Sequence, residues 1–379
     1  MQANPTSVFS KNSPQKVLVG LSGGVDSSVT ALLLKEQGYA VTGVTMSVYD
    51  GPPAEDIKTH GNACYDCSEA EDIAAATALT QKLDIPYHVF DCTGQYKKIV
   101  LDYFRSTYLA GQTPNPCVRC NHRLKFGVLP ELARQNGLDY DYFATGHYAQ
   151  VEFSDCYNKY VLRRGADAHK DQSYFLYRLD QAQLSHALFP LGAMHKQDVR
   201  AIAAKYGLAM HDKPDSQDFF GGEYTQLLGM NDLPGNIIDR KGNILGSHNG
   251  YWHFTPGQRK GLGVAAAEPL YVLEVNAERN EVLVGPYAQS LYAGCLLDDL
   301  HINIPLPEAG RLLQAKMRSA QKFIGVTVER AIPNDLTPQQ LEIHFNDPQT
   351  GVAPGQSLVL YLDDLVIGGG IIKEKIALA

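Results

Sequence analysis

The sequence predicts an α/β protein in three parts: an N-terminal doubly wound parallel-sheet domain, a small central domain and a C-terminal all-β barrel. In the N-terminal half, strand-like and helix-like apolar segments alternate, which is typical of a parallel sheet. Beyond residue 292 the pattern changes to short alternating strands between Pro, Gly and Asn turns. The length of 379 residues supports this division, because one hydrophobic core rarely organises so long a chain.

The N-terminal segments form a βαβ unit followed by further elements of the same kind. We predict strand, helix, strand, helix, strand and strand at residues 17–21, 27–37, 39–46, 69–82, 87–91 and 142–145. A sheet of this type carries helices on both faces. It binds its ligands at the carboxyl ends of its strands.

Changes in composition mark the predicted domain boundaries. Residues 1–15 are polar and rich in Pro, Ser and Asn, which predicts a disordered tail. Around residues 211–218 polar, Pro-containing sequence replaces the α/β pattern, and a Gly-rich segment with few helical periods follows. We therefore predict the parallel-sheet domain at 16–212, the central domain at 213–286 and the barrel at 287–379. Barrel strands are expected at 312–318, 325–332, 341–345 and 357–362.

Composition limits the function classes. No apolar run approaches the roughly 18–20 residues of a membrane span, and the N-terminus lacks the apolar core of a signal peptide, so we expect a soluble cytoplasmic protein. Seven cysteines in such a protein favour metal or sulfur chemistry over a disulfide framework. The net charge of −8 argues weakly against a nucleic-acid substrate, unless basic side chains gather on one face.

A glycine-rich loop, GLSGGVDSS at residues 20–28, joins the first strand to the first helix. Several backbone N–H groups converge there at the positive end of the helix dipole, which favours an anion such as phosphate. Gly23 and Gly24 allow the anion to approach the backbone closely. The loop is not a Walker A sequence, because no Gly-Lys-Ser/Thr follows. An ordinary Gly-rich turn is the alternative.

Two CxxC pairs are predicted at helix starts near the strand ends. Cys117 and Cys120 follow a Pro-rich turn, where the helix N-terminus and neighbouring arginines would lower a thiol pKa and favour a nucleophile. Cys64 and Cys67 precede Ser68-Glu-Ala-Glu, a capping-box pattern. Together the four thiols suit zinc or an iron–sulfur cluster, and a structural zinc or unrelated thiols are the alternatives. The remaining cysteines are expected to be ordinary small residues: Cys92, Cys156 and Cys295.

Several strings in one order resemble the bacterial tRNA-specific 2-thiouridylases (MnmA/TrmU), which are PP-loop ATP pyrophosphatases of the adenine nucleotide alpha hydrolase-like type. The strings lie at residues 20–28, 113–126, 144–148, 170–176, 213–217, 254–263 and 353–357. The resemblance implies a catalytic domain, a central domain and a barrel that clamps the anticodon arm of tRNA. It also implies 2-thiolation of the wobble uridine, in which Mg·ATP adenylates the C2 oxygen, pyrophosphate departs, and sulfur then displaces AMP.

The resemblance also implies roles for individual residues. The expected ATP-binding residues are Gly20, Leu21, Ser22, Gly23, Gly24, Val25, Asp26, Ser27, Ser28, Met46 and Gly146, with Asp26 helping to place Mg²⁺. Cys120, Cys117 and Asp26 are the expected catalytic residues. The expected tRNA contacts are Asn115, Pro116, His147, Lys170, Asp171, Gln172, Arg318, Ser319 and Gln356. A core role for Met46 and a supporting role for His147 are the alternatives.

One departure from the family concerns the sulfur. Family members normally carry a second catalytic cysteine, the persulfide carrier, soon after the string at 213–217, whereas this chain has Asp218-Phe-Phe-Gly-Gly-Glu-Tyr. Sulfur would then come from a donor protein or sulfide by another route. Related cluster-dependent tRNA thiolases imply a [4Fe–4S] cluster on three or four of Cys64, Cys67, Cys117 and Cys120. A structural zinc or a Cys117/Cys120 persulfide relay is the alternative.

Basic clusters and rival functions complete the sequence-based hypotheses. The clusters are Lys159, Arg163, Arg164 and Lys170, then Arg259 and Lys260, then Lys316, Arg318 and Lys322, and together they predict a strip that follows tRNA phosphates. A PP-loop amide or amidine synthetase would need neither the CxxC pairs nor a tRNA clamp. An RNA-binding module without catalysis would not need the phosphate loop.

Overall fold

The computed structural model describes residues 13–51, 63–208, 218–220, 224–329 and 340–378. Its first part is a five-stranded sheet in which all pairings are parallel, in the order β4-β2-β1-β5-β8. The strands are β1 (Lys16–Gly20), β2 (Ala40–Ser47), β4 (Tyr87–Asp91), β5 (Tyr142–Ala144) and β8 (Ala187–Leu188). The predicted parallel sheet is confirmed. The predicted tail lies largely outside the described residues and stays a prediction.

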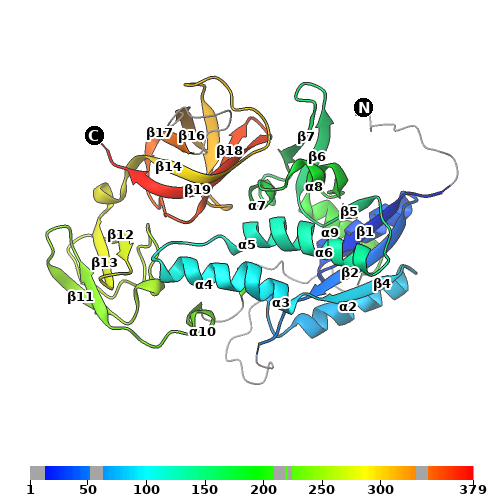
Figure 1. The fold of residues 1–379 in the computed structure, drawn as a ribbon, viewed down its shortest axis with the longest axis horizontal. Helices are drawn as coiled ribbons and strands as arrows, with labels where there is room; N and C mark the ends of the chain where they lie inside the picture. Colours follow the sequence, from blue (N-terminus) through cyan, green and yellow to red (C-terminus); the bar gives the residue numbers. More distant parts are fainter. Residues whose placement is uncertain (1–12, 52–62, 209–217, 221–223, 330–339, 379) are drawn as a thin grey trace.

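Three helices accompany this sheet: α1 (Val25–Glu36), α2 (Glu69–Lys82) and α9 (Lys196–Lys205) (Figure 1). The predicted bounds of α2 and β4 agree with the structure residue for residue. Helix α1 begins two residues earlier than predicted, because the chain turns helical directly after Gly24, its extended N-cap residue. Buried Val17, Val19 and Val29 join α1 to β1 in one core.

Two long helical segments lie beside the sheet (Figure 1). The first runs through α3 (Thr93–Tyr96), the π-helical segment η2 (Lys97–Leu101) and α4 (Asp102–Leu109). The second runs through α5 (Pro116–Arg119), the π-helical segment η3 (Cys120–Val128) and α6 (Leu129–Gln135). Pro116 opens α5, and the Asn115 side chain accepts a hydrogen bond from the Val118 N–H at 3.2 Å. The predicted helix after the Pro-rich turn is therefore present and capped by Asn115.

A hairpin that the sequence analysis did not predict follows β5. Strands β6 (Ala149–Ser154) and β7 (Lys159–Arg164) pair antiparallel, and β7 also pairs with the distant strand β19 at Arg163 and Leu365. The short helices α7 (Ser173–Leu176) and α8 (Gln181–His186) come next. The hairpin thus joins the first part of the chain to the last.

The central part contains a four-stranded sheet in the order β11-β10-β13-β12. Its elements are α10 (Tyr224–Leu228), β10 (Gly235–Ile238), β11 (Ile244–His248), the 3₁₀ turn η4 (Tyr251–His253), β12 (Leu270–Asn276) and β13 (Glu281–Pro286). Buried Phe104 of α4 shares a core with Leu228 and Trp252, so the central part packs on the first helical segment. Just before it, β9 (Asp218–Phe220) pairs in parallel with β3 (Ala63–Tyr65).

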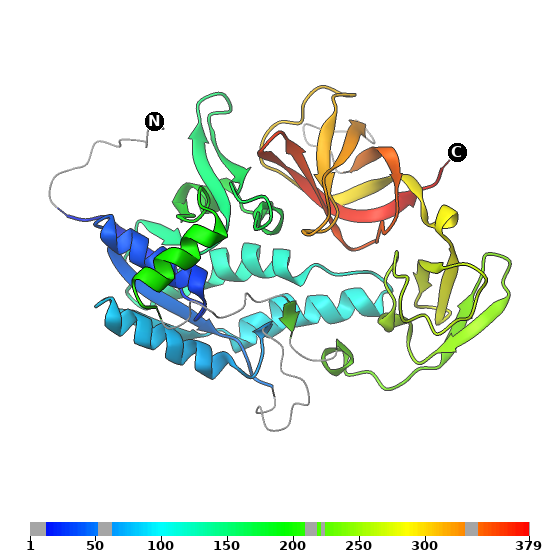
Figure 2. The same ribbon diagram turned by 180° about the vertical axis from the view of Figure 1, so that it is seen from behind.

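The C-terminal part is a closed barrel, as predicted. Its strands are β14 (Tyr292–Ile302), β15 (Leu313–Lys316), β16 (Ile324–Glu329), β17 (Leu341–Gln349), β18 (Ser357–Leu362) and β19 (Leu365–Ile376), preceded by the 3₁₀ turn η5 (Tyr287–Ser290). The order β14-β17-β16-β15-β18-β19 closes on itself through the β14–β19 pairing. Figures 1 and 2 both show the barrel and the β6–β7 hairpin on the same side of the two long helical segments.

Two of the predicted barrel strands differ in length from the observed ones. Strand β15 is shorter than predicted because a turn begins after Met317, and β17 is four residues longer. Residues 330–332 of another predicted strand lie outside the described part of the chain. Among the described helices, none combines the length and apolar character needed to cross a membrane.

Candidate active site

A large open pocket of about 930 Å³ lies at the carboxyl ends of β1, β2 and β5, where the parallel sheet was expected to bind its ligand. Three walls form it. One is the glycine-rich loop at residues 20–27. The second is the helical segment that carries Cys117, Asn121 and Lys125, and the third comes from the barrel at residues 319–323.

Backbone geometry explains the glycines of the loop. Gly23 has φ +66°, and a Cβ there would lie 2.6 Å from the backbone oxygen of Asp72. Gly146, in the turn after β5, comes so close to the loop that a Cβ would lie 2.8 Å from the Ser27 nitrogen. The Ser28 hydroxyl donates to the Gly24 carbonyl at 2.7 Å, whereas no side chain caps the N-terminus of α1. The N–H groups of this terminus therefore face the pocket without a side-chain cap, as an anion site requires.

The Asp26 carboxylate is held by two residues that lie far from it in the sequence. Lys196 Nζ, at the start of α9, donates to both carboxylate oxygens at 2.8 Å, and the Tyr148 hydroxyl donates to Oδ1 at 2.8 Å. Lys196 is 7% exposed, so this ion pair lies against the protein interior. The sequence analysis missed Lys196, because a lysine 170 residues from the loop belongs to no local motif.

The reactive part of the pocket contains three of the four CxxC thiols. Cys64 is exposed and lines the pocket together with half-buried Cys117, and Cys120 is buried on the same helical segment. Burial raises the pKa of the Cys120 thiol to about 11, and the nearby Lys125 ammonium offsets this only in part. The expected lowering of a thiol pKa is therefore wrong for Cys120.

The arginines invoked for that lowering face another cavity. Arg119 and Arg123 line a cavity of about 210 Å³ on the opposite side of the helix, together with Arg178. Arg119 stacks over the Tyr103 ring at 4.7 Å. These positive charges are therefore directed away from the wall that carries Cys117.

Lys125 is the cation that faces the thiols. Burial lowers the pKa of its ammonium group, but the neighbouring thiols of Cys64, Cys120 and Cys117 raise it by more. Burial and the charge of Lys125 together lower the pKa of His147 to about 3. His147 is consequently neutral at physiological pH, and its Nδ1 lies 2.8 Å from the Thr145 hydroxyl.

Cys67 stands apart from the other three thiols. Its Sγ–H donates to Asp66 Oδ1 at 3.1 Å, and it is not among the residues that line the pocket. The predicted capping box beside it does not form, because Ser68 is itself helical and caps nothing. The Glu69 carboxylate instead accepts from the Val48 N–H at 2.6 Å, which ties α2 to the end of β2.

The predicted tRNA contacts fall into two groups. His147, Lys170, Asp171, Gln172 and Ser319 line the pocket. Four others make internal contacts: Pro116 is buried, Asn115 Nδ2 donates to Gln356 Oε1 at 2.7 Å, and Arg318 donates to the Pro256 carbonyl at 3.2 Å.

The pocket is basic although the whole chain is acidic. Five lysine and arginine side chains line it against three aspartates: Lys125, Arg164, Lys170, Lys316 and Lys322 against Asp26, Asp72 and Asp171. Of the other predicted basic residues, Arg163 is paired with Glu152 and Asp364. The local excess of positive charge removes the objection that the net charge of −8 raised against a nucleic acid.

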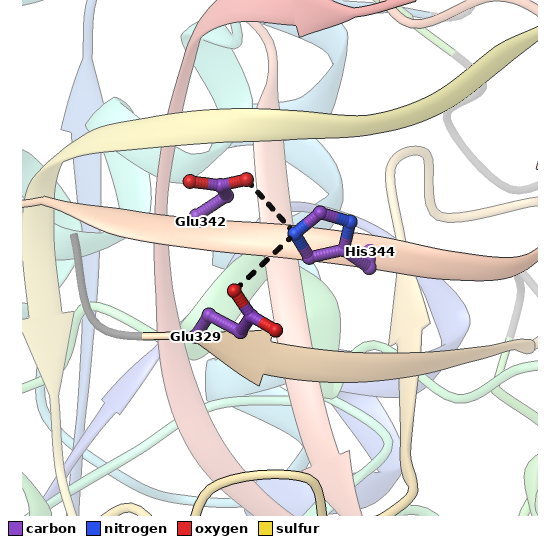
Figure 3. A group of neighbouring side chains, drawn as sticks. All are labelled: Glu329, Glu342 and His344. Atoms are coloured by element: carbon purple, nitrogen blue, oxygen red, sulfur yellow. Dashed lines mark ion pairs between the residues drawn. The ribbon is translucent and has the colours of Figure 1, made fainter. Parts of the chain in front are cut away.

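A different group of metal-ligand side chains lies on the barrel, outside the pocket. Figure 3 shows Glu342 and Glu329 directed toward the same ring nitrogen of His344, with O–N distances of 2.8 and 3.8 Å. In the described part of the chain these three form the one group of this kind whose ligand atoms all lie within 4.8 Å of one another. No three of the CxxC thiols are that close.

Family models match nearly the whole chain. They are the tRNA methyl transferase HUP domain at residues 15–220, the tRNA methyl transferase PRC-barrel domain at 226–286 and the aminomethyltransferase beta-barrel domain at 293–372. The tRNA-specific 2-thiouridylase MnmA of Endomicrobium trichonymphae is 46% identical over 362 residues, which cover 94% of this chain and 98% of the relative. The MnmA of Geotalea uraniireducens (strain Rf4) is 43% identical over 96% of each chain. The chain belongs to the tRNA-specific 2-thiouridylase family.

Membership of this family leaves the departure at residues 218–224 in place. Phe219 and Phe220 lie on β9, and the string at 213–217 lies outside the described residues. Phe219 is buried and its ring centroid lies 4.8 Å from that of Phe104. This 2-thiouridylase therefore has apolar core side chains where the family resemblance leads us to expect a thiol. Among solved structures, a 4-thiouridine synthetase in complex with RNA and ATP aligns over 57% of this chain and 49% of its own at 16% identity and a TM-score of 0.33.

Proposed function

We propose that this chain catalyses ATP-dependent 2-thiolation of the wobble uridine (U34) of tRNA in the cytoplasm, giving 2-thiouridine, AMP and pyrophosphate. The observation that carries the proposal is the pocket itself, in which an anion-binding loop, two thiols and a basic wall meet. An amide synthetase would need the loop alone. An RNA-binding module would need the basic wall alone.

The glycine-rich loop is the proposed site of the ATP phosphates. Backbone N–H groups at the start of α1 and the hydroxyls of Ser22, Ser27 and Ser28 would hold the departing pyrophosphate. Met46 and Gly146 line the same pocket at the ends of β2 and β5, where the adenosine would lie. The family's Mg²⁺ prefers oxygen ligands, and the Asp26 carboxylate fits that preference together with the ATP phosphates. The metal would neutralise phosphate charge there.

Adenylation is chemically necessary because the urea-like C2 carbonyl is a poor electrophile and oxide a poor leaving group. Transfer of AMP to the C2 oxygen releases pyrophosphate, and the oxygen then leaves as part of AMP when sulfur attacks C2. The wobble base must leave its stack to reach the pocket. Lys170 and Lys322 would bind the flanking phosphates, and neutral His147 could hydrogen-bond to the extruded base.

The sulfur would come from a donor protein or from sulfide by way of the pocket thiols. Soft thiolate ligands suit a [4Fe–4S] cluster, and the pocket offers Cys64, Cys117 and Cys120 beside the Lys125 ammonium, which balances their negative charge. When bound, the cluster would supply the reduced sulfur chemistry that the missing second cysteine provides elsewhere in the family.

The test uses purified full-length protein, unmodified tRNA, Mg·ATP and sulfide under anaerobic conditions. Nucleoside mass spectrometry should detect 2-thiouridine, and pyrophosphate release should depend on tRNA. A matched tRNA with cytidine at position 34 is the control and should stimulate neither. AMP formation that requires ammonia and yields no thiolated nucleoside would instead identify an amide or amidine synthetase.

A further inference from the structure

Cys64 lies on β3, whose backbone fixes the direction of its side chain. Ala63 and Tyr65, on either side, are buried, and alternate residues of a strand face opposite sides. The Tyr65 ring stacks on that of Tyr96 at 5.3 Å in the core, so Cys64 is directed out of the core, and it lines the ATP pocket.

The partner of β3 is β9, the strand without a thiol. The register pairs Ala63 with Asp218 and Tyr65 with Phe220, so Cys64 lies at the level of Phe219. The chain thus places a cysteine on the strand adjacent to the segment in which the family resemblance leads us to expect one. This position is set by strand pairing between residues more than 150 apart, which no local motif reveals.

Two separate groups sense the same three thiols. The charges of Cys64, Cys117 and Cys120 all act on the Lys125 ammonium and all act on the Tyr96 hydroxyl. Cys67, only three residues from Cys64, is engaged by Asp66 instead. The geometry therefore selects three of the four CxxC thiols.

The spacing of these thiols distinguishes between the possible groups. Two thiolates on one zinc ion are at most about 4.6 Å apart, because each Zn–S bond is about 2.3 Å long. No three of the four CxxC thiols lie within 4.8 Å of one another, so three of them cannot share one zinc ion as they stand. A larger inorganic group on the same three ligands meets this constraint.

We propose that Cys64 is the third thiol of the sulfur-transfer centre, holding a [4Fe–4S] cluster together with Cys117 and Cys120, and that Cys67 takes no part. The proposal rests on the proposed function and makes it more specific. Three protein ligands leave one coordination position of the cluster for a sulfur species. Lys125 supplies the positive charge beside the thiolates.

The experiment compares full-length wild type with Cys64→Ser and Cys67→Ser, purified anaerobically and reconstituted with iron and sulfide. Iron, acid-labile sulfide, visible absorption and the electron paramagnetic resonance signal of the reduced protein are measured. Cys64→Ser should lose most of the iron and the signal, whereas Cys67→Ser, the matched control from the same loop, should keep both. Thermal unfolding of each apo variant verifies that it is folded.

Wild-type levels of iron and sulfide in Cys64→Ser, or an equal loss in Cys67→Ser, would overturn the assignment. Colourless wild-type protein that thiolates tRNA at full rate from a persulfide donor would overturn the cluster. Pyrophosphate release separates these results from the proposed function. It should continue in Cys64→Ser because the phosphate loop is unchanged, and its absence in the wild type would refute the proposed function while the iron measurement still judges Cys64.

Discussion

At the residue scale, the Asp26 carboxylate joins three elements of the first domain. It accepts hydrogen bonds from Lys196 of α9 and from Tyr148 after β5, and itself belongs to α1. Removing the carboxylate beside a buried ammonium is costly, because the protein interior solvates the remaining positive charge poorly. The stability of the fold and the chemistry of the phosphate loop are therefore linked at this side chain.

We predict that Asp26→Asn abolishes tRNA-dependent pyrophosphate release and lowers the free energy of unfolding by about 1–3 kcal/mol, because Lys196 loses its charged acceptor. Denaturant unfolding and a pyrophosphate assay measure the two effects. The double variant Asp26→Asn/Lys196→Gln should regain part of the stability and none of the activity. Normal ATP turnover in Asp26→Asn would contradict the assignment of the loop.

His147 makes a second prediction, on pH. Burial holds its pKa at about 3 in the folded state, below its ordinary value of 6.5, so the unfolded state binds the proton first as pH falls. Its contribution to stability is complete above pH 6.5 and is lost as pH falls toward 3, by up to about 1.4 kcal/mol per pH unit. In His147→Gln the free energy of unfolding should fall less steeply between about pH 6.5 and 4. The exposed His186→Gln is the control and should follow the wild type.

The residues that sequence alone could identify are those in contiguous strings. The phosphate loop, Cys117 and Gly146 all line the pocket, as adjacent letters of recognisable motifs suggested. Lys196 and Lys125 were not singled out, because each acts through partners brought near only by folding. The thiol pKa was wrong for the same reason, since burial of Cys120 is a tertiary property.

At the scale of elements, the close approach of the β5 turn to the phosphate loop gives a third prediction. Gly146→Ala places a methyl group 2.8 Å from backbone atoms of Asp26 and Ser27, so the loop must shift and ATP affinity should fall at least about tenfold, which corresponds to about 1.4 kcal/mol. Calorimetric titration with ATP measures this. Gly94→Ala, at a helical position with nothing within 4 Å, is the control and should bind ATP normally. Equal affinities of both variants would show that the close approach is unimportant.

Elements with strong local periodicity were predicted well, and pairings between distant segments were not. Helix α2 and strand β18 have the predicted bounds, because their apolar spacing is a local property. The pairing of β3 with β9 and of β7 with β19 has no local signature, since the partners lie roughly 150 and 200 residues apart. The missing information in both cases was the partner and not the strand type.

At the scale of the whole molecule, charge is separated between the pocket and the rest of the surface. We predict that Lys322→Ala, an exposed pocket residue, weakens tRNA binding and reduces the slope of log Kobs against log salt by roughly 0.7–0.9 for each phosphate that its ammonium group neutralises in the wild type. Fluorescence titrations at several salt concentrations measure the slope. Lys241→Ala, exposed in the central domain, is the control. The same slope in wild type and Lys322→Ala would place the tRNA elsewhere.

The pairing of β7 with β19 has a consequence for the order in which the chain is made. Arg163 emerges from the ribosome about 200 residues before Leu365, its partner across the sheet. At a synthesis rate of about 5–20 residues per second, the outer edge of the hairpin stays unpaired for roughly 10–40 s. An unpaired strand edge is a template for association with other chains. Nascent chains that stall before β19 should therefore aggregate more readily than the finished protein.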